Sequence, residues 1–163
     1  AVSESNSVEK RILESLKSKF GESILEDGWE GALAPKRIRT FASREKIVEV
    51  AQAIKELGFD QVISQGGTDY PKDDIFKVNY HLIAVDNEEL KPIILSLATK
   101  LPRNDPKMST LTNVWRSAEF HEQETFENFG IFFEGHPRME RLLLPEDWDD
   151  IPPLRKEFTL PGR

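Results

Sequence analysis

Cysteine is absent from this chain of 163 residues. Thiolates hold most iron–sulfur clusters and most structural zinc ions, so we expect the chain to carry neither kind of centre. Disulfide bonds are excluded for the same reason. If the chain works beside electron-transfer clusters, another protein must hold them, and we expect the chain itself to bind no cofactor.

Long apolar runs are also missing, since the longest, residues 93–98, is far shorter than the roughly 18 residues of a membrane span. The N-terminal residues lack the basic and apolar regions of a signal peptide, and none is predicted. Basic residues are outnumbered by acidic ones, 22 against 29, which gives a net charge of −7. This balance argues against binding to nucleic acid or to anionic membranes.

Motifs for nucleotide binding or nucleophilic catalysis are lacking too, and Ser109, Thr110 and Thr112 are predicted to be helix caps. A metal site can nevertheless be drawn, because His121 and Glu124 share a helix face at i, i+3 spacing. The sequence H-E-Q-E-T has no second histidine four positions on and so departs from the zinc-protease motif. A stand-alone metal-dependent enzyme that uses these two residues and His136 is the alternative hypothesis.

Apolar periodicity predicts helices and strands over the first hundred residues. Ser7 is a candidate N-cap for the first helix, and the pair Gly66-Gly67 predicts a bulge in a strand. The predicted elements are a helix over 7–20, an edge strand over 37–42, a helix from 43 to 57, and strands over 61–70, 75–85 and 93–99. Three sequential strands packed against helices make an α+β, two-layer domain.

The segment from Trp115 to Pro137 organises the chain. Placed on one helix, Trp115, Ala118, Phe126 and Phe129 form a narrow apolar stripe. Glu122 lies in the middle of that stripe, and a buried carboxylate requires a partner or a raised pKa. Gly130 is predicted to end this helix, with a short strand over 131–133 behind it.

The nearest cations to Glu122 along the chain lie downstream, at Arg138, Arg141 and Arg155. We therefore expect the segment after Gly130 to fold back over the helix, with Arg141 or Arg155 paired to Glu122. That ion pair would attach the C-terminal part of the chain to the helix.

The last 19 residues, 145–163, contain four prolines, many acids and bulky apolar side chains without a regular period. A disordered tail is one interpretation, although such tails usually lack large apolar residues. Fully extended, the segment spans on the order of 60 Å, more than the roughly 40 Å width of a compact domain of this size. We predict a docking domain over 1–144 and an extended C-terminal arm that lies along a neighbouring protein.

Several spaced motifs in the last third of the chain resemble one family. They are W-x-x-A at Trp115 and Ala118, E-Q-E-x-x-E-x-F-G over 122–130, G-H-P over 135–137, R-L-L-L-P-E-D-W over 141–148 and P-L-R-K-E-F over 153–158. Together they resemble the 30 kDa subunit of respiratory complex I, which is the C subunit of the NADH-quinone oxidoreductases. The upstream two thirds agree only in the order of helices and strands.

This resemblance implies a mixed, mostly antiparallel sheet with helices on one face. It also implies a non-catalytic subunit that docks on the hydrogenase-like 49 kDa large subunit, next to an iron–sulfur subunit, on the cytoplasmic or matrix side of the membrane. The complex would pass electrons to quinone or methanophenazine and translocate ions. The signature residues would then serve the interface or the fold: Trp115, Glu122, Glu124, Glu127, Gly130, His136, Pro137, Arg141, Pro153, Leu154, Arg155 and Lys156.

The chain departs from the family pattern at three positions. Gln123 replaces an arginine, Glu127 replaces an aspartate, and Glu140 stands where a second arginine is common. These changes favour a divergent branch, such as an archaeal deazaflavin- or ferredoxin-dependent relative or a membrane-bound hydrogenase.

Overall fold

A four-stranded sheet forms the centre of the computed structural model, which describes residues 8–24 and 36–160. Its strands are β1 (Arg37–Phe41), β2 (Gln61–Tyr70), β3 (Ile75–Ile83) and β4 (Ile94–Pro102), in the spatial order β1-β4-β3-β2. β1 lies at the edge, as predicted, and runs parallel to β4, whereas the β4–β3 and β3–β2 pairs are antiparallel. The mixed, mostly antiparallel α+β fold is confirmed.

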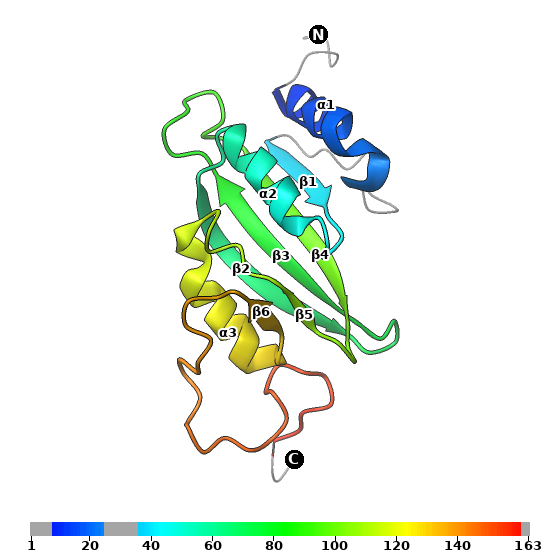
Figure 1. Cartoon of the computed structure of the whole chain (residues 1–163), viewed down its shortest axis with the longest axis vertical. Coiled ribbons are helices and arrows are strands. Elements are labelled where there is room, and N and C mark those ends of the chain that lie inside the picture. Colours follow the sequence, from blue (N-terminus) through cyan, green and yellow to red (C-terminus); the bar gives the residue numbers. More distant parts are fainter. Residues whose placement is uncertain (1–7, 25–35, 161–163) are drawn as a thin grey trace.

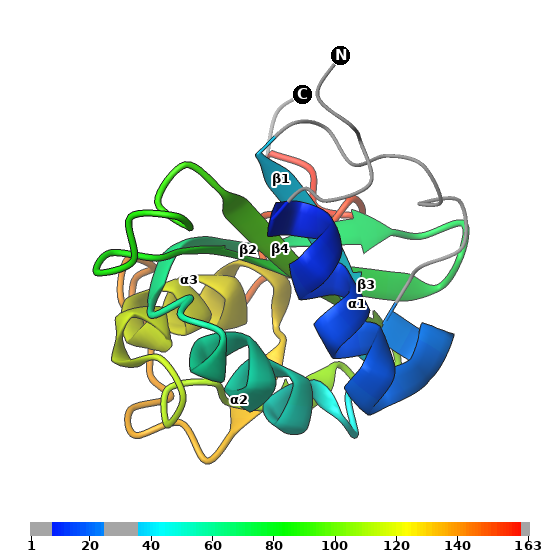
Figure 2. The same cartoon turned by 90° about the horizontal axis from the view of Figure 1, so that it is seen from above.

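Helices cover one face of this sheet (Figures 1 and 2). α2 (Ile47–Glu56) and α3 (Glu119–Phe129) lie over the same face, and α1 (Val8–Phe20) packs against α2 and β1. The remaining elements are η2 (Gly21–Ile24), η3 (Arg116–Ala118) and a small parallel pair, β5 (Lys107–Ser109) with β6 (Phe132–Glu134).

The core lies between the sheet and the helices. Along β3 burial alternates residue by residue, so that Phe76, Val78, Tyr80 and Leu82 all face the helices and are inaccessible to solvent. α2 contributes Ile47, Val50, Ala51 and Ile54 from its apolar face. Each large apolar side chain buried here contributes about 1.5–3 kcal/mol to folding.

The bulge predicted at Gly66-Gly67 is wrong. Gly66 pairs regularly with Asn79 and Gly67 with Val78, and the register shift lies between Val62 and Ser64. Glycine at 67 has another reason, because a Cβ atom there would lie 2.9 Å from the ring of Phe129 on α3. The glycine therefore admits the helix rather than bending the strand.

Other boundaries differ by a few residues. α2 begins at Ile47 instead of Ser43, because Ser43 accepts a turn hydrogen bond from the Lys46 amide at 3.0 Å before the helix starts. The short strand β5 occupies part of a stretch expected to be a loop. Ser7, the predicted cap of α1, lies outside the described residues.

No helix or strand is formed between residues 135 and 160, which we call the C-terminal segment. It runs as a wide loop around the end of α3 (Figure 1, orange to red). Gly130 ends α3 as predicted, in the left-handed conformation at φ 72°. The prediction that the last residues lie along a neighbour stays a prediction.

Candidate docking site around helix α3

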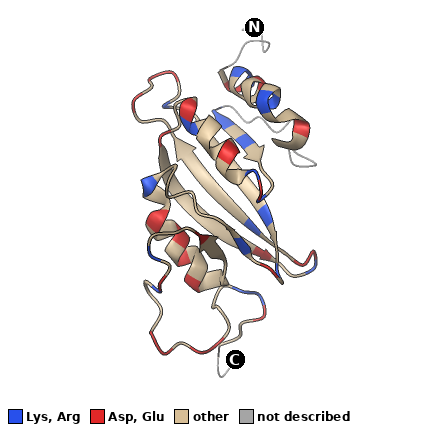
Figure 3. Cartoon of the chain, viewed as in Figure 1, with Lys and Arg blue, Asp and Glu red and all other residues tan. Residues whose placement is uncertain are grey.

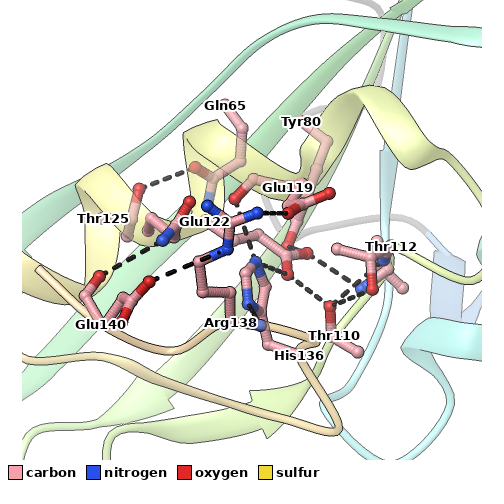
Figure 4. A network of polar contacts seen from close by, with 12 residues as sticks. Gln65, Tyr80, Thr110, Thr112, Glu119, Glu122, Thr125, His136, Arg138 and Glu140 are labelled. Atoms are coloured by element: carbon pink, nitrogen blue, oxygen red, sulfur yellow. Dashed lines mark hydrogen bonds and ion pairs between the residues drawn. The ribbon is translucent and has the colours of Figure 1, made fainter. Parts of the chain in front are cut away.

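Glu122 is completely buried where α3 faces the sheet, and neutral donors satisfy its carboxylate. The Tyr80 hydroxyl and the Leu111 amide each donate to Oε1 at 2.9 Å, and the Thr110 hydroxyl donates to Oε2 at 2.5 Å (Figure 4). Thr110 and its neighbours therefore do not cap the helix, whose N-terminus has no side-chain cap. The predicted ion pair with Arg141 or Arg155 is wrong, because both arginines bind carbonyl oxygens elsewhere.

Burial raises the pKa of Glu122, and its three hydrogen bonds oppose this shift. The pKa of Tyr80 is raised well above its usual value, first by burial and then by the negative charge of Glu122. Tyr80 therefore keeps its proton and remains a donor to Glu122. The sequence requires a partner or a raised pKa for Glu122, and the fold supplies hydrogen-bond partners together with a raised pKa.

His136 connects the turn after β6 to the start of α3. Its Nε2 lies 3.0 Å from the carbonyl oxygen of Glu119, and its Nδ1 accepts the Arg138 amide at 3.0 Å. This pattern assigns the hydrogen to Nε2 and leaves the imidazole neutral. Its Nε2 is 3.9 Å from Oε2 of Glu122, and both side chains are fully buried. Pro137, the next residue, is exposed.

Glu127 holds the loop after residue 141 against α3. Its carboxylate accepts the backbone amides of three consecutive residues, Leu142, Leu143 and Leu144, at 2.9–3.1 Å. The Glu127 side chain comes from the helix and is only 5% exposed as a residue. Hydrogen bonds to a charged acceptor are stronger than neutral ones, so one side chain fixes a loop that has no regular structure.

Arg141 and Gln123 support the same loop. Arg141 donates through Nη1 to the carbonyl oxygens of Pro145 and Glu146, both at 3.1 Å. Gln123, which replaces an arginine of the family pattern, donates to the carbonyl oxygen of Glu140 at 3.4 Å. The C-terminal segment thus does fold back over α3.

Residues 154–156 form a second attachment, at the C-terminal end of α3. The Leu154 amide donates to the Asn128 carbonyl at 3.0 Å, and Arg155 Nε donates to the Phe129 carbonyl at 2.7 Å. The Arg155 guanidinium also lies 5.1 Å from the ring centre of Phe76, within the range of a cation–π contact. A Cβ at Gly130 would lie 2.8 Å from Arg155 Nη2, so the glycine also makes room for this side chain.

Asp69 receives the next residue and is missing from the sequence prediction. It is 4% exposed, accepts the Lys156 amide at 2.9 Å and lies 3.0 Å from Arg103 Nε. Its position gave a usable signal, because alternation along 61–70 places this charge on the inward face of the strand. Tyr80, whose hydroxyl binds Glu122, was equally undetected.

The other predicted residues have simpler surroundings. Trp115 precedes α3 instead of lying on it, is 1% exposed, and donates through Nε1 to the Phe59 carbonyl at 2.8 Å. Pro153 is half-buried, and Leu154 leaves 54% of its surface exposed. Glu124 is exposed on the outer side of α3.

The residues of the metal-enzyme alternative are not brought together. His136 is bonded on both ring nitrogens, and Glu124 and His121 lie on the outer side of the helix. Among residues 8–24 and 36–160, no three histidine or acidic side chains are grouped so that they could hold a metal ion. Within the same ranges, no helix has both the length and the apolarity to cross a bilayer.

Comparison with known proteins gives consistent relatives. The chain is 39% identical over 150 residues to the C subunit of the F420H2 dehydrogenase of Methanosarcina mazei, covering 91% of this chain and 90% of that protein. It is 36% identical over 154 residues to the C subunit of the NADH-quinone oxidoreductase of a Roseiflexus species, covering 91% and 83%.

Two solved structures share the fold. One is a trypsin-resistant fragment (1–134) of Nqo5, with a TM-score of 0.64 and 30% identity, covering 79% of this chain and 97% of the fragment. The other comes from the structure of the membrane-bound sulfane sulfur reductase, an archaeal respiratory membrane complex, with a TM-score of 0.77 and 23% identity over 93% and 85%.

The family pattern of the respiratory-chain NADH dehydrogenase 30 kDa subunit matches residues 41–163. This match spans α2, the strands from β2 to β6, α3 and the C-terminal segment. Together with the relatives above, it shows that the chain belongs to the 30 kDa subunit family of the respiratory-chain NADH dehydrogenase.

Proposed function

We propose that this chain is a non-catalytic, peripheral-arm subunit of a complex I-like membrane oxidoreductase. On this proposal it docks on the hydrogenase-like 49 kDa large subunit, beside an iron–sulfur subunit, and supports assembly of the electron path to quinone or methanophenazine. It is held at the cytoplasmic face of the membrane, or at the matrix face in a mitochondrion, through its partners.

The observation that carries the proposal is the use of the buried carboxylates. Glu122, Glu127 and Asp69 each accept backbone amides of a loop, and each is at most 5% exposed. Groups engaged in this way hold a surface in place and are poorly accessible to a substrate. The signature residues therefore fit a structural and docking role better than a catalytic one.

The names of the relatives support the same role. The Methanosarcina and Roseiflexus proteins are both named as one lettered subunit of a dehydrogenase or oxidoreductase, and this chain spans most of their length. Because the chain has no cysteine, clusters and electron transfer in such a complex would be supplied by other subunits.

The test is gentle purification of a tagged chain from the membranes of its source cells, followed by native mass measurement and identification of its companions. Recovery with a hydrogenase-like large subunit and an iron–sulfur subunit is the expected result. Recovery as a single chain at its monomer mass, in preparations made without detergent, would overturn the proposal.

The electron donor is a separate question within the proposal. The identity to the F420H2 dehydrogenase protein, 39%, slightly exceeds the 36% to the NADH-quinone oxidoreductase protein. We propose the deazaflavin-linked type. Oxidation of reduced F420, but not of NADH, by the purified complex is the expected result, and the reverse preference would contradict it.

A further inference from the structure

Leu142 and Leu143 are held with their side chains in solvent. Their backbone amides both point at the Glu127 carboxylate, at 2.9–3.1 Å. Their side chains are left outside the core, and the residues are 42% and 70% exposed. Leu144, the third residue bound by Glu127, is half-buried.

The loop that carries these leucines is fixed from both sides. Glu127 binds its amides, while Arg141 binds the carbonyl oxygens of Pro145 and Glu146. A loop that is already ordered loses little further conformational freedom on binding, so more of its contact energy appears as affinity. Fixing two exposed leucines in this way does nothing for the apolar core of the free chain.

The charges around the leucines are mostly negative. Between residues 138 and 150 there are two arginines and five acids, a net charge of −3, and all five acids are exposed. Figure 3 shows these acidic positions spread along the loop below α3. A complementary surface would be apolar at its centre and basic at its rim.

We propose that Leu142 and Leu143 form a preformed knob that inserts into an apolar pocket with a basic rim on the partner protein. This inference rests on the proposed function, whose large subunit is the occupant to be tested. Glu127 and Arg141 are positioning residues, which act on binding by holding the knob in its bound shape.

The first experiment measures the dissociation constant between the purified full chain and the purified large subunit by isothermal titration calorimetry. Leu143→Ala is expected to weaken binding about tenfold, and Leu143→Asp about a hundredfold. Val85→Ala is the matched control, because Val85 is 43% exposed and follows the end of β3 opposite to Phe76, the residue that contacts the end of α3. Its binding and the thermal midpoints of all three variants should equal those of the wild type.

Higher salt concentration should also weaken wild-type binding, because the acidic surround and the basic rim are screened. Two failures are distinguishable. If the wild-type chain does not bind the large subunit, the proposed function is wrong in its partner. If it binds and Leu143→Asp binds equally well, the proposed function survives and the knob is rejected.

Glu127→Gln tests the positioning role. It should accelerate amide hydrogen exchange at residues 142–144 and weaken binding although both leucines remain. Glu124→Gln, on the outer side of the same helix, should change neither. Faster exchange with unchanged affinity would show that the knob need not be preformed and would overturn that part of the inference.

Discussion

The sheet with α2 and the C-terminal segment around α3 are stabilised in different ways. The first region buries a continuous apolar core, in which strands and helices satisfy their own backbone groups. The second has no regular structure, and the side chains of Glu127, Asp69 and Arg155 bind its backbone or that of α3. Apolar packing tolerates substitution by similar shapes, whereas a carboxylate that accepts several amides has few substitutes.

The largest expected effect breaks the core side of this comparison. Trp115→Ala should lower the free energy of unfolding by about 3–5 kcal/mol, because it leaves a cavity and removes the donor to the Phe59 carbonyl. Trp148→Ala changes the same residue type in the C-terminal segment, where it is half-buried, and should cost about 1 kcal/mol. Denaturant titration of both variants measures the difference, and equal losses would contradict the comparison.

The second effect breaks the other side. Glu127→Ala removes the acceptor of three backbone amides and should lower the free energy of unfolding by about 1–3 kcal/mol. Glu124→Ala, at an exposed position of the same helix, should stay within about 0.5 kcal/mol of the wild type. Chemical denaturation measures both, and comparable losses in the two variants would remove the special role of Glu127.

The third effect sharpens the junction between the regions. Gly130→Ala places a side chain at φ 72° and near Arg155, and should cost about 1–2 kcal/mol. Gly66→Ala is the control, because its Cβ would meet no atom within 4 Å. Thermal denaturation compares them, and an unaffected Gly130→Ala would mean that α3 ends without need of a glycine.

The smallest effect concerns pH. Burial raises the pKa of Glu122 above its usual value of 4.5, so the folded state binds the proton more firmly than the unfolded state. Its contribution to stability therefore increases as pH falls from the folded-state pKa toward 4.5 and is lost as pH rises, by at most about 1.4 kcal/mol per pH unit.

Glu122→Gln cannot titrate, so the stability of the wild type relative to this variant should grow on acidification from pH 7 toward 4.5. Urea titrations at several pH values measure that difference. A difference that stays constant, or that shrinks on acidification, would show that the three hydrogen bonds to the carboxylate outweigh its burial.

Secondary structure could be predicted where periodicity was strong. The apolar alternation of β3 and the apolar face of α2 each follow from local sequence, and the left-handed glycine after α3 was a reliable stop signal. The bulge failed because Gly67 serves packing against Phe129, and that contact joins residues far apart in the chain. Local sequence does not contain such information.

The candidate site was predicted in its residues and mistaken in its bonds. Glu122 was identified because a charge in an apolar stripe is a local anomaly, and this anomaly is visible in the sequence. Its partners Tyr80 and Thr110 come from β3 and from the loop after β5, and neutral hydroxyls leave no signature comparable to a charge. Opposite charge was therefore the wrong criterion for choosing a partner.

The sequence by itself determined the family, the absence of thiolate-bound centres, the order of helices and strands, and the presence of a buried carboxylate. Composition and short-range spacing carry all of these. Only the tertiary structure decided which groups meet: Glu127 with three leucine amides, Asp69 with Lys156, and Arg155 with the end of α3. The physical reason is that backbone amides are present at every residue except proline, so the acceptor that each one finds depends on the fold alone.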